Sequence, residues 1–450
     1  MTAADELSRR EAPLDREKPD RVVRIGLLGC GNVGAAFLRL LDEEGPAIAT
    51  RTGTCLDVTA IGVRRPAEER PGIDMRRGGR LVTSELSLIA TDPAIDVVVE
   101  LLGGIEPAQS VILRALQNRK PVVTANKELV AHHGSGLMAA ADEAGVDLLF
   151  EAAVGGALPL VRLLRESLAG ENVTRVSGIV NGTTNFVLTE MSEKGCDLAE
   201  ALEDARRRGF AESDPRSDLE GDDAASKAAI LAGLAFDADV VARDVHREGI
   251  VGVRSVDITF ARQLGYEVKL LALAERVSSE TLAVRVHPAM LLREHPLASV
   301  RGPFNAVFVE GESSGELMVL GRGAGGRPTA SAVLGDVLEV SHHLGERTRG
   351  RRYRRRPTRL VPMTALSHEY YLSLDVSDEP GVLAAVAASF GRHGVSIRSM
   401  EQVGLGDEAR LVFITHTALE ADFTATLDEL GALESVKEIG CFLRVVGNDR

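Results

Sequence analysis

A glycine-rich turn between an apolar strand and a helix lies near the start of the chain. The run Val22–Leu28 is continuously apolar apart from Arg24, Gly29-Cys30-Gly31-Asn32-Val33-Gly34 follows it, and Ala35–Glu43 has a helical pattern. The first glycine permits a tight turn, the second lets a phosphate approach the backbone, and the third lets the helix pack on the strand. Free N–H groups at the start of a helix also favour phosphate. The segment therefore predicts a nucleotide-binding α/β fold.

The same alternation of apolar strands and helices continues to about Phe150. Continuous apolar strands separated by helices indicate a parallel sheet that is covered on both faces. We expect a Rossmann-type dinucleotide-binding domain over residues 21–150, after a polar, disordered tail over residues 1–20. The tail is all that precedes Val22, so no further catalytic domain is expected there. Other strands and helices are expected at Asp96–Leu102, Ala108–Asn118, Pro121–Ala125 and Asp147–Phe150.

The end of the second expected strand, Leu56–Val63, bears on the choice of nucleotide. An NAD site requires an acidic residue there to accept from the ribose 2′-hydroxyl. Arg64 and Arg65 occupy that place instead, whereas Asp57 lies near the opposite end of the strand. Arginines suit a 2′-phosphate, so the sequence favours NADP(H), with NAD(H) left open.

The rest of the chain divides into four further segments. Mixed helices and strands predict an inserted α+β domain over residues 151–320, for substrate binding and dimerisation, and the C-terminal pattern βαββαβ is typical of a ferredoxin-like domain. We expect a helix over residues 321–345 that returns to the nucleotide domain, a basic linker over residues 346–367, and the ferredoxin-like domain over residues 368–450.

Composition excludes several classes of function. The net charge of −14 argues against binding to nucleic acid or to an anionic membrane, and no apolar run is long enough to cross a bilayer. The four cysteines are widely spaced, with no disulfide framework or metal-ligand spacing, which indicates a reducing, cytoplasmic location.

Two groups of basic residues have ordinary explanations. Eight arginines lie between Arg347 and Arg359, and we interpret them as a solvated linker in preference to a polyanion-binding patch. The histidine pairs His132–His133 and His342–His343 lack carboxylates at ligand spacing and are expected at the surface.

Asp223 and Lys227 are four residues apart on an expected helix, Asp222–Phe236, so they share one face. Several carboxylates precede them, including Glu212 and Asp218. Such a group can hold an ammonium ion near a lysine, although a surface ion pair is the commoner explanation for this spacing.

The stretch Glu212–Lys227 resembles the signature of homoserine dehydrogenases. Other segments resemble that family in the same order along the chain: Thr124-Ala125-Asn126-Lys127, Glu151-Ala152-Ala153-Val154-Gly155-Gly156, Asn181-Gly182-Thr183-Thr184-Asn185 and Gly323-Ala324-Gly325. The resemblance implies reversible hydride transfer between L-homoserine and L-aspartate 4-semialdehyde, in the biosynthesis of threonine, methionine and isoleucine.

The resemblance also implies roles for individual residues. Lys227 is the implied acid–base residue, assisted by Asp223 and Lys127. The implied substrate-binding residues are Glu212, Asp223, Thr183, Asp218 and Lys127. The implied dinucleotide contacts, besides residues 29–34, Arg64 and Arg65, are Gly103, Lys127, Gly209 and Gly325. A loop for Na⁺ or K⁺ is implied at Glu151, Val154, Gly156 and Leu158, where a carboxylate and backbone carbonyls suit a hard cation. A simple turn that crosses between domains is the alternative.

The C-terminal segment resembles the ACT domain, through Asp378-Glu379-Pro380-Gly381-Val382-Leu383 and Gly391–Ile397. The resemblance implies an amino-acid site at a dimer interface, with threonine as the effector and a homodimer or homotetramer as the assembly. A purely dimerising domain is the alternative. Truncation after about Glu346 is expected to abolish inhibition and spare catalysis.

Two rival functions are disfavoured. A phosphorylating aspartate-semialdehyde dehydrogenase needs an activated cysteine with a histidine partner, and Cys196 in a turn between helices has no such setting. A regulatory amino-acid sensor with a vestigial nucleotide fold would not need Lys127, Glu212, Asp223 and Lys227 together.

Overall fold

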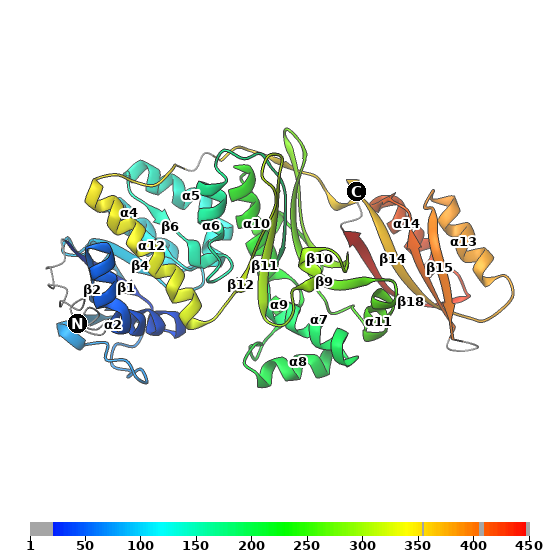
Figure 1. The fold of residues 1–450 in the computed structure, drawn as a ribbon, viewed down its shortest axis with the longest axis horizontal. Helices are drawn as coiled ribbons and strands as arrows, with labels where there is room; N and C mark the ends of the chain where they lie inside the picture. Colours follow the sequence, from blue (N-terminus) through cyan, green and yellow to red (C-terminus); the bar gives the residue numbers. More distant parts are fainter. Residues whose placement is uncertain (1–20, 353–354, 405–408, 447–450) are drawn as a thin grey trace, which may run out of the picture.

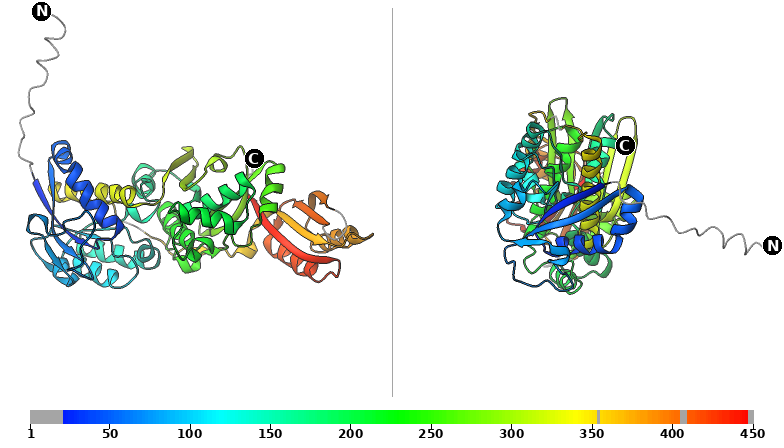
Figure 2. Two further views of the ribbon diagram at one scale, coloured as in Figure 1. Left: turned by 90° about the horizontal axis from the view of Figure 1, so that it is seen from below. Right: turned by 90° about the vertical axis from the view of Figure 1, so that its left-hand side faces the viewer.

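The computed structural model describes residues 21–352, 355–404 and 409–446, and the expected tail over residues 1–20 lies outside them. Three parts follow one another along the long axis of the molecule (Figure 1). The first is blue and cyan, the second green, and the third orange and red, and a view from below keeps this order (Figure 2). In the described residues, no helix is both long and apolar enough to span a membrane.

The N-terminal part is built on a six-stranded sheet in which every pair of neighbours is parallel. The strand order β3-β2-β1-β4-β5-β6 puts β1 beside β4, so the loops that follow these two strands meet at the carboxyl edge. The expected Rossmann-type fold is therefore confirmed. Its elements are β1 (Arg21–Leu28), α2 (Asn32–Thr52), β2 (Thr54–Gly62), β3 (Leu81–Thr83), α3 (Leu86–Thr91), β4 (Val97–Glu100), α4 (Ala108–Gln117), β5 (Val122–Thr124), α5 (Lys127–Ala144) and β6 (Leu148–Leu149).

Helix α2 is longer than the expected Ala35–Glu43, because Pro46 lies inside it without ending it. Pro46 is exposed, so water can satisfy the carbonyl group that loses its N–H donor. Ile48, two residues later, is buried and keeps the last turns packed on the domain.

The middle part contains an antiparallel sheet with the order β12-β11-β7-β9-β10. Helices α7 and α10 pack on β9, which gives the α+β arrangement that was expected. Strand β12 was not expected, because it lies at the edge and most of its residues are exposed, which weakens the apolar pattern. The elements are β7 (Val173–Ile179), α7 (Gly182–Lys194), α8 (Leu198–Arg207), α9 (Arg216–Leu219), α10 (Asp222–Phe236), β8 (His246–Arg247), α11 (Ser255–Gln263), β9 (Tyr266–Ser278), β10 (Thr281–Leu292), β11 (Phe304–Gly311) and β12 (Gly315–Arg322).

Helix α12 (Gly326–Glu346) leaves the middle part and packs against α2. Its buried residues Val333, Val337 and Val340 share one apolar core with the central strand β1. The nucleotide-binding part is thus completed by a helix that begins almost 300 residues after the start of α2, and the yellow helix in Figure 1 lies beside the blue one.

The C-terminal part has the expected order βαββαβ, with the strand order β18-β14-β16-β15. The expected ferredoxin-like fold is confirmed. Its elements are β14 (Ser367–Val376), α13 (Val382–Arg392), β15 (Ile397–Val403), β16 (Arg410–Thr415), α14 (Glu420–Gly431) and β18 (Val436–Val446).

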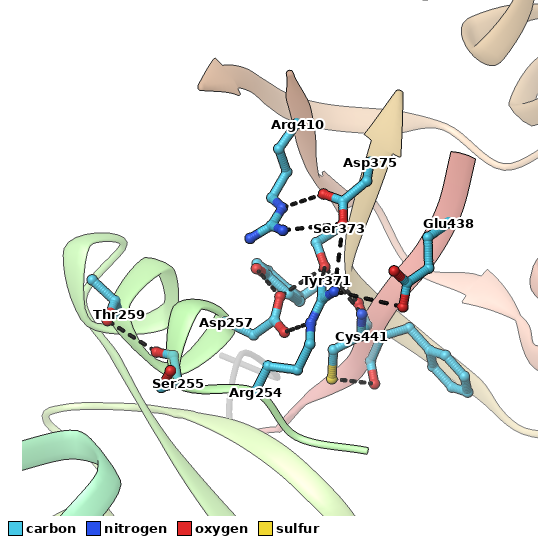
Figure 3. Close-up of polar contacts among 11 residues, drawn as sticks. Arg254, Ser255, Asp257, Thr259, Tyr371, Ser373, Asp375, Arg410, Glu438 and Cys441 are labelled. Carbon is cyan, nitrogen blue, oxygen red and sulfur yellow. Dashed lines mark hydrogen bonds and ion pairs between the residues drawn. The ribbon is translucent and has the colours of Figure 1, made fainter. Parts of the chain in front are cut away.

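Alternate residues of β14 face opposite neighbours. Tyr370, Leu372 and Leu374 pack on the domain's own helices, whereas Tyr371 belongs to the apolar core of the middle part. Ser373 lies on the same side as Tyr371 and reaches α11 (Figure 3). In addition β18 pairs in parallel with β10, so one sheet runs through both parts.

Part of the arginine-rich segment is held against the protein, so its interpretation as a solvated linker describes only part of it. The exposed arginines are Arg347, Arg351, Arg352, Arg356 and Arg359. Arg355 donates to Ser135 Oγ over 2.8 Å, and Arg349 lies 3.7 Å from Asp142. Residues Arg359–Leu360 form β13, which pairs with β10. His343, expected at the surface, is instead mostly buried and contacts Asp147 Oδ2 at 2.7 Å. Arg354 lies outside the described residues.

Candidate active site

The expected ion pair on α10 lies in the interior of the protein. Lys227 Nζ donates to Asp223 Oδ2 over 2.8 Å and to the backbone oxygen of Val180 over 2.6 Å. Lys227 and Asp223 are only 8% and 5% exposed. Val180 directly follows β7, so the end of this strand fixes the direction of the lysine. An exposed pair of this kind contributes little, but a buried one is costly unless it is fully bonded.

Asp223 also binds the lysine at the start of α5. Lys127 Nζ contacts Asp223 Oδ1, so one carboxylate holds two ammonium groups from two parts of the molecule. Asn181 Nδ2 donates to the same carboxylate over 2.9 Å. Burial alone would raise the pKa of Asp223, but the charges of Lys227 and Lys127 lower it well below its usual range.

Other carboxylates act on Lys127 from the acidic loop before α10. Burial alone would lower the pKa of Lys127, but Asp223, and then Asp218 and Glu212, raise it above its usual value. Asn181 Nδ2 donates to Asp218 Oδ1 over 2.7 Å, which ties this carboxylate to the end of β7. Glu212 is exposed, so its carboxylate is open to a ligand.

Thr183 lies at the start of α7, close to the same loop. Asn181 caps this helix by accepting from Thr184 N over 2.8 Å. The Thr183 hydroxyl donates to the backbone oxygen of Phe210 over 2.7 Å. A substrate contact by Thr183 would therefore use the acceptor side of its hydroxyl or exchange this bond.

The three glycines of the first turn differ in what surrounds them. Gly29 has φ 98°, and a Cβ there would lie 2.5 Å from the oxygen of Leu101. A Cβ at Gly34 would lie 2.3 Å from the oxygen of Gly29, so the fold itself requires both glycines. Nothing lies within 4 Å of a Cβ at Gly31, and no side chain caps α2. Gly31 and the first N–H groups of α2, at Asn32 and Val33, thus leave room for a phosphate.

Two cavities meet at Lys127. One, of about 290 Å³, is lined by Gly103, Gly156 and Lys227, and it lies between the nucleotide-binding and middle parts. The other, of about 430 Å³, is lined by Asp223 and Arg247. Lys127 lines both, so its ion pair with Asp223 separates a space beside Lys227 from a second space on the other side.

Family models match most of the chain in three consecutive pieces. Residues 29–151 match the model described as "Homoserine dehydrogenase, NAD binding domain", residues 159–338 match "Homoserine dehydrogenase", and residues 370–435 match "ACT domain". A homoserine dehydrogenase of Mycobacterium tuberculosis is 45% identical over 444 residues, which covers 96% of this chain and 98% of the relative.

The chain belongs to the homoserine dehydrogenase family. It is therefore an NAD(P)-dependent oxidoreductase that acts on a CH–OH group in amino-acid biosynthesis. The homoserine dehydrogenase of Corynebacterium glutamicum is likewise 45% identical, over 95% of this chain and 96% of the relative.

Solved structures of the family agree with the fold. The crystal structure of a homoserine dehydrogenase from Thiobacillus denitrificans is similar with a TM-score of 0.87 and 36% identity, and the match covers 94% of this chain and 98% of that one. A hyperthermophilic archaeal homoserine dehydrogenase in complex with NADPH has a TM-score of 0.61 and 28% identity, and covers 71% of this chain.

The arginines predicted to distinguish the two dinucleotides lie just past the end of β2. Arg64 and Arg65 are exposed, and Arg65 lies 3.7 Å from Glu68. Asp57 pairs with Arg24 in the first half of β1, away from the glycine turn.

The sequence analysis missed a third arginine near the glycine turn, Arg70. Burial raises the pKa of the Cys30 thiol in that turn, and Arg70 is the strongest of the charges that oppose the shift. The position of Arg70 depends on the path of the loop between β2 and β3, which the sequence pattern does not determine.

The predicted cation loop has an unexpected hydrogen-bond pattern. The Glu151 carboxylate accepts from Val161 N over 2.7 Å and from Arg162 N over 3.0 Å, so its oxygens bind backbone within the protein. The backbone oxygen of Leu158 accepts from Leu160 N over 2.8 Å. With these oxygens engaged, the backbone carbonyl groups of Val154 and Gly156 are the ligands that the loop offers most readily to a monovalent cation.

Two predicted glycines lie outside the cavity beside Lys227. The lining of that cavity includes Gly323 and Ala324 but not Gly325 or Gly209. Gly209 has φ 74° and follows α8, next to Phe210. Contacts of Gly209 and Gly325 with a dinucleotide therefore stay predictions.

Three supporting residues were missed from the sequence. Glu100 is fully buried, and its carboxylate accepts from Thr124 Oγ1 over 2.5 Å and from Leu102 N over 2.7 Å. Burial raises its pKa, against the effect of these bonds. Asn126 Nδ2 donates to Gly104 O over 2.6 Å, and Asn181 bridges Asp218 and Asp223. The available signals were a charged residue at the end of the apolar strand β4, at Glu100, and the places of Asn126 and Asn181 in the segments that resemble the family.

Proposed function

We propose that this enzyme catalyses reversible NADP(H)-dependent hydride transfer between L-homoserine and L-aspartate 4-semialdehyde, with Lys227 as the acid–base residue. The observation that carries the proposal is the Lys127–Asp223–Lys227 bridge beside the cavity between the nucleotide-binding and middle parts. In the oxidative direction a neutral Lys227 removes the hydroxyl proton. In the reductive direction its ammonium group donates the proton to the carbonyl oxygen.

The dinucleotide is assigned to the turn over residues 29–34 and to α2. A bound nicotinamide group would accept or supply the hydride. The free N–H groups of α2 suit a pyrophosphate, and Arg64, Arg65 and Arg70 suit a 2′-phosphate, which supports NADP(H) over NAD(H). The similar archaeal homoserine dehydrogenase was solved in complex with NADPH, which agrees with this choice.

The substrate ammonium group is assigned to Glu212 and Asp218. Asp223 was predicted to share this task, but its oxygens already accept from Lys127, Lys227 and Asn181. We therefore assign Asp223 to holding the two lysines in place. Glu212 is exposed and Asp218 accepts from a single described side chain, so both have oxygens left for a ligand.

Feedback inhibition by threonine is assigned to the C-terminal domain. Gly381 has φ 96° and begins α13 with no side-chain cap, so the first N–H groups of α13 suit the carboxylate of an amino acid. Asp378 lies in the same loop and suits its ammonium group. We further propose cytoplasmic location, a homodimer or homotetramer, and a Na⁺ or K⁺ bound by the carbonyl groups of the Glu151–Leu158 loop.

One assay tests the reaction and its regulation together. The absorbance of NADPH is followed after aspartate semialdehyde is added, and the assay is repeated with NADH in place of NADPH. Each assay is run with and without threonine. Oxidation that depends on the semialdehyde, faster with NADPH and slowed by threonine, supports the proposal. Equal rates with the two dinucleotides would contradict the choice of NADP(H), and indifference to threonine would favour a purely dimerising C-terminal domain.

A further inference from the structure

A short segment, His246–Ile250, connects the C-terminal domain with the acidic loop of the active site. Its first two residues form β8, which pairs with Arg285 and Val286 of β10. Glu248 N then donates to the backbone oxygen of Val286 over 2.8 Å. We call His246–Ile250 the connecting segment. Its backbone is fixed on one side by the central sheet.

On its other side the connecting segment contacts the loop that leads into α10. Ile250 N donates to the backbone oxygen of Leu219 over 2.8 Å, and Arg247 pairs with Asp222 at 2.5 Å. A Cβ at Gly249 would lie 2.0 Å from that same Leu219 oxygen, so the two backbones are in direct contact. Leu219 is four residues before Asp223. A displacement of the connecting segment therefore reaches the start of the catalytic helix without an intermediate side chain.

Arg444 of the C-terminal domain binds the connecting segment through Glu248. It lies on β18 and is 2% exposed. Its two terminal nitrogens donate to the two carboxylate oxygens of Glu248, each over 2.8 Å. Its Nε donates to Glu420 Oε2 over 2.9 Å. A planar guanidinium held between two carboxylates fixes position as well as charge.

We propose that Glu248 is a positioning residue of the active site, and that Arg444 sets its place. Removing the Glu248 charge frees the connecting segment on the side of the C-terminal domain. The acidic loop, which contains Asp218, is then held less firmly by the connecting segment. In the described part of the chain, the glycine turn of the nucleotide site makes no contact with that segment and keeps its position. The expected effect thus falls on homoserine and not on the dinucleotide. The inference rests on the reaction of the family and does not depend on threonine.

A second polar cluster at the same boundary provides a matched control. Asp257 of α11 is fully buried and accepts from Tyr371 OH over 2.9 Å and from Ser373 Oγ over 2.7 Å (Figure 3). Arg254 Nε donates to it over 3.0 Å. Like Glu248, Asp257 is a carboxylate that joins the middle part to the C-terminal domain and pairs with an arginine. Its hydrogen bonds do not involve the acidic loop.

The test compares full-length Glu248→Gln and Asp257→Asn with the parent enzyme. Glu248→Gln is expected to raise the KM for homoserine roughly 3- to 30-fold, with the KM for the dinucleotide unchanged. Asp257→Asn is expected to lower the melting temperature and leave both KM values unchanged. Equal changes in the KM for homoserine in the two variants would overturn the proposal, since loosening of the boundary would then explain both. An unchanged KM in Glu248→Gln would overturn it as well.

Variants of Arg444 test the second half of the proposal. Arg444→Met leaves two carboxylates without their partner, so Arg444→Lys is made beside it, which keeps the charge and loses the fork. The KM for homoserine is expected to rise in Arg444→Lys in the same direction as in Glu248→Gln. An Arg444→Lys enzyme with the parent KM would show that the fork does not set the place of Glu248.

Discussion

Lys227 and Asp223 lie one turn apart on α10 and are joined by a 2.8 Å hydrogen bond in the interior of the protein. Asp223 is also the partner of Lys127, 96 residues earlier in the chain. The carboxylate therefore brings the start of α5 and the middle of α10 to one point. The first two predictions concern Lys227 and the carboxylates near Lys127.

Replacing Lys227 by alanine should remove the acid–base group. We expect kcat to fall by about 10²- to 10⁴-fold with a modest change in KM, since the group acts in the transition state. Steady-state kinetics with homoserine and NADP check this. Lys194→Ala, at the exposed end of α7, is the control. A Lys227→Ala enzyme with near-parental kcat would move the proton transfer to Lys127 or to water.

Replacing Glu212 by alanine should raise the KM for homoserine more than the KM for NADP. The reason is the loss of an exposed carboxylate that acts on Lys127 and that we assign to the substrate ammonium group. Asp223→Ala should also raise the KM for homoserine, and lower kcat in addition, because both lysines lose their partner. Glu220→Ala removes another exposed carboxylate of the loop and serves as control. A Glu212→Ala enzyme with the control's KM would contradict its role.

Replacing Arg64 and Arg65 by neutral residues should weaken the binding of NADP more than the binding of NAD, because a charge-assisted contact to the 2′-phosphate is lost. The ratio of the two kcat/KM values measures the effect. Arg51→Ser, at the end of α2, removes an exposed arginine outside the expected site. If the ratio stays the same in the double variant, Arg70 is the next residue to change.

Lys269 predicts a pH dependence of stability. Burial lowers the pKa of Lys269 to about 8, and its ammonium group bonds to Asn185 and to the Val300 carbonyl. In the unfolded chain the pKa is about 10.4, so the unfolded state binds more protons between about pH 8 and about pH 10. The contribution of Lys269 to the free energy of unfolding is therefore complete above the pKa of the unfolded chain. It is lost as the pH falls to the pKa of the folded protein.

Chemical denaturation across that range measures the effect. The parent should gain stability relative to Lys269→Met as the pH rises from about 8 to about 10. The slope is the test, because the substitution also removes two hydrogen bonds and so shifts the stability of the variant by an amount that does not depend on this titration. Parallel curves for parent and variant would show that Lys269 keeps its usual pKa.

Truncation after Glu346 should cost stability in addition to any loss of inhibition. The cut removes β18 from the edge of β10 and removes Arg444 from Glu248. It also uncovers the apolar side of the middle part that Tyr371 and Leu443 cover. We expect a lower melting temperature and a greater tendency to aggregate. Asp378→Ala, with Asp428→Ala as control, tests threonine binding without this disruption.

Much of the fold follows from local patterns in the sequence. The apolar strand and the glycine turn were expected where they are, and α2 begins three residues before the expected Ala35. The positive φ of Gly29 and the contact of Gly34 with the Gly29 oxygen both arise within a few residues of the turn. The same holds for Asp223 and Lys227, whose spacing of four puts them on one face of any helix. The βαββαβ order of the C-terminal domain also follows from alternating periods of two and 3.6.

Only the tertiary structure decided how these pieces meet. The contact of Lys127 with Asp223, the bridge made by Asn181, and the grip of Arg444 on Glu248 join residues 42 to 196 positions apart. A periodic pattern specifies which face of an element is apolar, but not which other element covers it. The linker, expected to be solvated, shows the same limit, because Arg355 lies against Ser135 only once α5 and α10 are packed together.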